Sequence, residues 1–148
     1  MDTQSNQNLA PYAPLVDALK SPLPETIAQR ETLRQMVAFA ESYGIVVSEH
    51  RRLLLSQVEA QTADKLSQLK AGWHYNEEGE YVKTEEAATA YAKLNADEKK
   101  IMLAAEVASI SAELEFVTNL ENLIKRRCSL GQTISNSFNT ETSSQYNN

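Results

Sequence analysis

Apolar residues recur every three or four positions along Asn95–Arg127, a stretch of the chain without glycine or proline. This period places the apolar side chains on one face of an α-helix. Asn95 supplies a side-chain oxygen for the start of the helix, and Glu98, three positions later, completes a capping box. The pattern therefore predicts a long C-terminal helix over residues 96–129.

The apolar face of this helix forms a seam that needs a neighbouring helix, because only a second helix can cover so long a stripe. Another copy of the chain would provide one, so we expect the C-terminal helix to drive oligomerisation. Packing inside an ordinary bundle of the same chain is the alternative. The residues of this predicted seam are Leu103, Val107, Ile110, Leu114, Val117 and Ile124.

Weaker helical patterns lie upstream. A first amphipathic helix begins near Ser21 and ends at Gly44, and a second one, capped by Ser48, follows over residues 49–71. A short alanine-rich helix begins after Thr84. The expected fold class is mainly α-helical.

Before the alanine-rich helix the pattern changes to aromatic and β-branched residues, in Trp73-His74-Tyr75 and again in Glu80-Tyr81-Val82-Lys83. These runs flank Asn76–Gly79, a polar segment with glycine late in it, which is typical of a tight turn. The sequence therefore predicts a short β-hairpin near residues 73–83.

The length of 148 residues is that of one domain with a substantial core. Residues 1–20 form a polar, proline-containing lead-in that we expect to be flexible. Residues 21–135 should form a single helical domain. From Gly131 onward Ser, Thr, Asn and Gln dominate, so residues 136–148 are expected to be a disordered polar tail.

The 14 basic and 20 acidic residues leave a formal net charge of −6, which argues against binding nucleic acid through overall charge. The charge is nevertheless segregated. Residues 51–76 carry four cations and two acids, whereas residues 77–98 carry seven acids and two cations. The second predicted helix is therefore locally basic where it leads into the aromatic hairpin.

The sequence contains no phosphate-binding glycine loop, no nucleophile elbow and no zinc-protease motif. Its single cysteine, Cys128, continues the apolar seam, which favours packing over nucleophilic chemistry. We predict a protein that is not an enzyme and binds no metal or cofactor. The chain has no signal-peptide pattern and no apolar run of membrane-spanning length, so we expect a cytoplasmic protein without membrane contact.

The aromatic residues of the hairpin have two interpretations. They can pack on the helices, or they can offer ring faces to the bases of single-stranded nucleic acid while nearby cations contact its phosphates. The residues that we expect at such a DNA-binding site are Lys65, Lys70, Trp73 and Tyr75, with Arg51 and Arg52 earlier in the second helix.

Four short motifs occur in a fixed order: Val58-Glu59-Ala60-Gln61, Leu69-Lys70-Ala71, Leu94-Asn95-Ala96-Asp97, and Ile124-Lys125-Arg126-Arg127 with Ile134 beyond it. In their order and spacing, over about residues 50–134, the chain resembles the UvsY-type phage recombination mediators. Lys70 matches the family's Leu-Lys-Ala-Arg motif, whereas Gly72 stands where that motif has arginine.

The resemblance implies a protein without catalytic activity that binds single-stranded DNA. It also implies a ring-like homo-oligomer, assembled through C-terminal helices, that helps a phage RecA-like recombinase replace the phage single-strand-binding protein. Its setting would be the cytoplasm of a phage-infected bacterial host. A ring suits an acidic chain, because linked copies multiply a weak binding site.

Two other functions fit parts of the pattern. A helical virion or scaffold component would oligomerise without binding DNA, and its acidic residues 77–98 would face a basic partner. An acidic mimic of DNA is less favoured, because the acids alternate with basic clusters. Binding of single-stranded DNA that weakens with salt would distinguish the mediator from the scaffold component.

Overall fold

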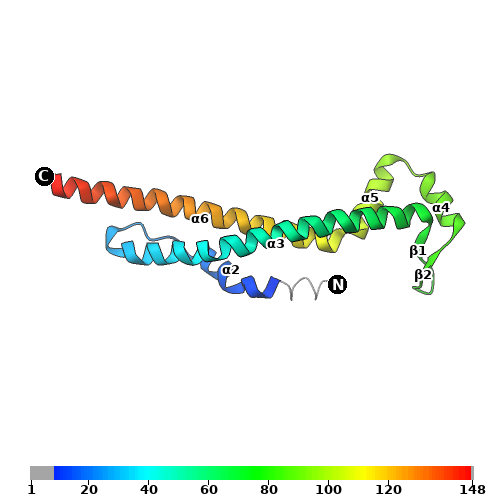
Figure 1. Ribbon diagram of the computed structural model, residues 1–148, viewed down its shortest axis with the longest axis horizontal. Helices are drawn as coiled ribbons and strands as arrows, with labels where there is room; N and C mark the ends of the chain where they lie inside the picture. The colour runs from blue at the N-terminus through cyan, green and yellow to red at the C-terminus, as the bar shows by residue number, and fades with distance from the viewer. Residues whose placement is uncertain (1–8, 148) are drawn as a thin grey trace. The chain divides into compact units, whose positions relative to one another are not determined.

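The computed structural model describes residues 9–147 and is mainly α-helical with a short β-hairpin, which confirms the predicted fold class (Figure 1). In chain order the elements are η1 (Ala10–Tyr12), α2 (Ala13–Leu19), η2 (Ile27–Gln29), α3 (Arg30–Ala71), β1 (Trp73–Tyr75), β2 (Tyr81–Lys83), α4 (Glu85–Ala92), α5 (Ala96–Glu106) and α6 (Ala108–Asn147).

The described residues fall into two compact units rather than the single domain expected over 21–135. The first unit holds residues 9–52 and 115–147, and the second holds Leu53–Leu114. Each of the two long helices, α3 and α6, contributes one part to each unit.

Helix α3 is a single helix of 42 residues that runs unbroken through Gly44, where the sequence predicts a helix end. The reason is burial: Leu33, Ala40 and Val47 lie seven residues apart and are all buried, so one core-facing stripe passes straight through the glycine. Glycine inside a helix costs about 1 kcal/mol relative to alanine. Burying Leu33 and Val47 contributes about 1.5–3 kcal/mol each, which outweighs that cost.

Within the first unit α3 and α6 lie side by side and antiparallel (Figure 1). Arg30 near the start of α3 donates a hydrogen bond to Asn139 near the end of α6. A Cβ atom built at Gly131 would lie 2.3 Å from Cγ2 of Val37, so glycine allows the two backbones to approach closely there.

Helix α6 continues to Asn147, so the disordered tail predicted over residues 136–148 is wrong for the part that the structure describes. Val117, Ile124 and Phe138 are buried on one stripe at seven-residue multiples, and Phe138 anchors the polar segment. Three threonine side chains in the C-terminal part of α6 each donate a hydrogen bond from the hydroxyl group to the backbone carbonyl oxygen four residues earlier. They are Thr133, Thr140 and Thr142.

Residues 1–8 of the predicted flexible lead-in lie outside the described residues, but the rest of it is ordered. Leu15 of α2 is completely buried, and Tyr12, three residues earlier, is buried as well. The Tyr12 hydroxyl lies 2.9 Å from Nδ1 of His50, and burial raises the pKa of Tyr12. The buried Leu15 side chain and the contact between the Tyr12 hydroxyl and His50 therefore hold α2 within the first unit.

The helix predicted over residues 96–129 is interrupted at Val107, the residue between α5 and α6. Its start is as predicted: the Asn95 side chain accepts a hydrogen bond from the Glu98 backbone N–H at 2.8 Å, in a complete capping box. Val107 departs from helical geometry with φ −112° and ψ 15° while its side chain is buried. The sequence has no glycine or proline at this point, so the break is associated with the packing of Val107 and not with a helix-breaking residue.

Candidate nucleic-acid interface

The predicted hairpin is present in the second unit. Strands β1 and β2 pair antiparallel, with Tyr75 opposite Tyr81 and Trp73 opposite Lys83. Asn76 organises the turn, because its side-chain oxygen accepts a hydrogen bond from the Glu80 backbone N–H at 2.8 Å. This register places the rings of Trp73, Tyr75 and Tyr81 next to one another.

These three rings, the aromatic cluster, form a row in which Tyr81 neighbours the other two: Trp73 is stacked on it, whereas the plane of Tyr75 is tilted from it by 46°. The Trp73 and Tyr81 ring centroids are 5.2 Å apart with planes 18° from parallel, and those of Tyr75 and Tyr81 are 4.9 Å apart. Tyr75 remains 66% exposed. The cluster therefore combines the two sequence interpretations: Trp73 packs against a neighbouring ring, whereas Tyr75 presents its ring to solvent.

Two lysines of α3 belong to this unit. Lys65 Nζ lies 5.5 Å from the centre of the Tyr81 ring and 3.9 Å from a carboxylate oxygen of Glu106. Lys70 is exposed in the last turn of α3 and makes no hydrogen bond or ion pair with any described residue. The predicted residues Lys65, Lys70, Trp73 and Tyr75 thus lie on α3 and the hairpin that follows it.

Gly72 joins α3 to the hairpin in a conformation that favours glycine. Its φ of +94° is one that side-chain-bearing residues rarely adopt, and a Cβ atom would lie 2.1 Å from the Thr84 carbonyl oxygen. The Thr84 backbone N–H also donates to the Gly72 carbonyl oxygen at 3.2 Å. Glycine at this position therefore permits the tight connection between α3 and the hairpin.

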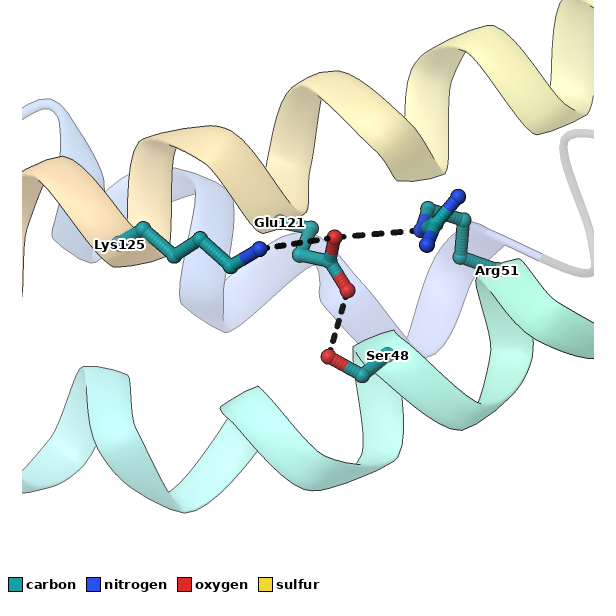
Figure 2. A network of polar contacts seen from close by, with 4 residues as sticks. All are labelled: Ser48, Arg51, Glu121 and Lys125. Carbon is teal, nitrogen blue, oxygen red and sulfur yellow. Dashed lines mark hydrogen bonds and ion pairs between the residues drawn. The ribbon is translucent and has the colours of Figure 1, made fainter.

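Arg51 lies in the first unit, in a polar network centred on the buried carboxylate of Glu121 (Figure 2). Ser48 donates a hydrogen bond of 2.5 Å to one carboxylate oxygen of Glu121. Arg51 Nε and Lys125 Nζ approach the other oxygen at 3.1 and 3.4 Å. The Nε–H of Arg51 has no hydrogen-bond partner among the described residues, so its contact with Glu121 is ionic.

These partners keep Glu121 ionised. The hydrogen bond from Ser48 is the main cause of its lowered pKa, and Lys125 and Arg51 lower the pKa further, whereas burial opposes them. The network explains why the polar residue Glu121 lies within the buried, otherwise apolar face of α6. It also neutralises Arg51, one of the cations expected to contact DNA.

Arg52 is likewise paired. Its guanidinium group lies 2.5 Å from a carboxylate oxygen of Glu49, three residues earlier on the exposed face of α3. The hydrogen bond from Arg52 lowers the pKa of Glu49. Neither acidic partner was predicted from the sequence, although the Glu49-to-Arg52 spacing of three residues is visible there.

The residues of the predicted seam point largely into the protein's own core. Val107, Val117 and Ile124 are buried, whereas Leu103, Ile110 and Leu114 are half-buried. A second stripe on α6, which the sequence analysis overlooked, is exposed instead. It consists of Phe116, Leu123 and Leu130, again at seven-residue spacing.

Within residues 9–147 no three His, Cys, Asp or Glu side chains gather in a way that would hold a metal ion. Burial is the main cause of the raised pKa of Cys128, so its thiol is not activated as a nucleophile. In the same described part of the chain, no helix has the length and apolar character needed to cross a bilayer.

Comparisons with protein-family models, with curated proteins and with solved structures gave no match to this chain.

Proposed function

We propose that this protein is a non-catalytic, single-stranded-DNA-binding assembly protein that acts as a recombination mediator. In this role it helps a phage RecA-like recombinase replace the single-strand-binding protein on DNA. The observation that carries the proposal is the exposed Tyr75 ring on the aromatic cluster, with Lys70, which has no partner among residues 9–147, at the end of the adjoining helix. The ordered sequence motifs of UvsY-type mediators supply the second support.

The aromatic cluster can bind single-stranded DNA of any base sequence. Every base has a π-face that can stack on a tyrosine ring, and a lysine near that ring can contact the adjoining phosphate. Lys65 lies over the Tyr81 ring of the same row, so a cation is available there once its long contact with Glu106 exchanges for a phosphate. Each copy then contributes one small site.

Assembly of several subunits makes such a small site sufficient for DNA binding. A strand bound by one subunit meets the sites of neighbouring subunits at high effective concentration, so modest single-site affinities multiply. This accounts for DNA binding by a chain of net charge −6. The exposed apolar stripe on α6 provides surface for subunit contacts.

Fluorescence anisotropy of a labelled oligonucleotide across a salt series tests the proposal. We expect binding that weakens as salt rises, and Lys70→Ala should weaken binding and make the salt dependence shallower, because one phosphate contact is lost. Lys93→Ala, which changes an exposed lysine at the end of α4, is the matched control and should leave binding unchanged. No binding by the wild-type protein at low salt would refute the proposal.

A helical assembly component that does not bind DNA is the second candidate. Its specific support is that three of the cations predicted to contact DNA are already paired with carboxylates: Arg51 with Glu121, Arg52 with Glu49, and Lys65 with Glu106. This candidate predicts a stable oligomer with no affinity for the oligonucleotide at any salt concentration.

A further inference from the structure

The exposed stripe of α6 is one wall of an apolar groove in the first unit, and α2 with the segment after it forms the other wall. Two adjoining hollows, each of about 340 Å³, make up this groove and share Leu19 and Leu123. Its apolar lining includes Val16, Leu19, Leu23, Phe116, Leu123 and Leu130. We call it the α2/α6 groove.

The rim of the α2/α6 groove is cationic. Lys20, Arg126 and Arg127 line it, and no aspartate or glutamate is found among its described lining residues. Arg127 is fixed in place, because it donates hydrogen bonds of 2.8 and 2.5 Å to the carbonyl oxygens of Leu19 and Ser21. A ligand that fits this groove is therefore apolar along its middle and acidic at its edge.

One surface of this same chain has that chemistry. Helix α5 exposes two neighbouring large apolar side chains, Ile101 at 69% and Met102 at 40% of their surface. Asp97 and Glu98 are exposed one helical turn earlier, four residues before each of them. Since residues four apart lie on the same side of a helix, the acids and the apolar pair form one continuous face, the α5 face.

The dimensions of the two surfaces also agree. The stripe from Phe116 to Leu130 extends over about 21 Å of helix. The 11 residues of α5 extend over about 16 Å, so the whole of α5 can lie along the stripe. The seven-residue spacing of the stripe is the one at which side chains of one helix seat between those of another.

We infer that the α5 face of one copy docks into the α2/α6 groove of a neighbouring copy. The inference rests on the assembly included in the proposed function and assigns the two surfaces that make it. Because the surfaces differ, the contact is head-to-tail, and each copy retains a free groove and a free α5 face. Such contacts propagate until they close a ring or extend as a filament.

Cysteine cross-linking tests the pairing directly. In a Cys128→Ser background, Ile101→Cys and Leu123→Cys are prepared as separate proteins with tags of different size, mixed under conditions that allow subunit exchange, and gently oxidised. We expect a disulfide-linked dimer that contains one copy of each variant, and little linked product from either variant alone. Ile45→Cys, an exposed apolar position on α3, replaces Ile101→Cys as the control and should give no mixed dimer.

Charge reversal provides a second measurement that does not depend on oxidation. Arg126→Glu and Asp97→Lys should each weaken self-association, measured by sedimentation, by about tenfold, and the double variant should recover most of that loss. Lys93→Glu is the control. Glu98 is left unchanged because it belongs to the capping box of α5.

The results separate the two proposals. A wild-type protein that is a single subunit at micromolar concentration overturns both the proposed assembly and this inference. An assembled wild-type protein that gives no mixed dimer, and whose mass responds to neither charge reversal, overturns the inference alone. The groove would then bind a different protein, and the DNA-binding proposal would stand on its own measurements.

Discussion

The cations of the two units have different environments. In the first unit Arg51 contacts the buried Glu121 and Arg52 contacts Glu49, so both charges are balanced within the protein. In the second unit Lys70 is exposed with no partner among the described residues, and Lys65 lies over an aromatic ring. A count of basic residues along the sequence treats all four alike, yet of these four only the two lysines belong to the unit that holds the aromatic cluster.

The two units also differ in the contacts that stabilise them. Seven-residue stripes of buried side chains and the polar network around Glu121 connect α3 and α6 in the first unit. Stacked rings, a tight connection at Gly72 and short capped helices characterise the second unit. We therefore expect the two units to respond separately to substitution.

Gly72→Ala should have the largest effect. A Cβ atom at this position meets the Thr84 carbonyl oxygen at 2.1 Å, and φ is +94°. We expect a loss of about 2–4 kcal/mol in the free energy of unfolding, from backbone strain and the clash together. Fluorescence of Trp73, the single tryptophan, reports unfolding of the second unit directly.

Gly79→Ala is the matched control for that prediction. Gly79 also has a positive φ, of +79°, but apart from its chain neighbours no described residue has a heavy atom within 4 Å of the position that a Cβ atom would occupy there. It should therefore cost only the strain of about 1 kcal/mol. Equal losses at both glycines would show that the close approach at Gly72 does not stabilise the hairpin connection.

Glu121→Ala should destabilise the first unit by about 2–3 kcal/mol, because it leaves the partly buried Arg51 without its counter-charge. Urea unfolding followed by far-UV circular dichroism measures the loss. Glu115→Ala, at an exposed position on the same helix, should change the free energy of unfolding by less than about 0.5 kcal/mol. A similar small loss for Glu121→Ala would show that the network adds no stability.

Stability should also depend on the ionisation of Glu121. Its pKa in the folded protein is lowered from the ordinary value of 4.5, so its contribution is present above about pH 4.5 and disappears as the pH falls through the folded value. Unfolding measured from about pH 7 to about pH 3 should show wild type losing more stability than Glu121→Gln. Parallel pH profiles would contradict this assignment.

Tyr75→Ala should weaken oligonucleotide binding by about tenfold, because one stacking surface for a base is removed. Tyr75→Phe retains the ring and should bind as wild type does. Anisotropy titrations at one salt concentration compare the three proteins. If Tyr75→Phe lost as much affinity as Tyr75→Ala, a hydrogen bond from the hydroxyl, rather than stacking, would hold the strand.

Arg52→Ala should have the smallest effect. Its charge is balanced by Glu49 on the exposed face of α3, so neither the unfolding midpoint nor the affinity for DNA should change measurably. Lys70→Ala, measured in the same titration, provides the contrast. Equal losses in affinity for the two variants would remove the distinction between the cations of the two units.

Local signals in the sequence were sufficient for several elements. The capping box at Asn95, the cap at Thr84 and the hairpin turn at Asn76 are all present as predicted. Each depends on side chains that bond to backbone groups within four residues, so no distant part of the chain is needed to specify them.

The tertiary structure decided the rest. The continuity of α3 through Gly44, the helical course of α6 past Gly131 and the break at Val107 all follow from which side chains are buried against other elements. Burial depends on neighbours that are distant in sequence, and local propensity is too weak to oppose it. For the same reason only the structure shows which cations meet carboxylates and which apolar stripe of α6 remains exposed.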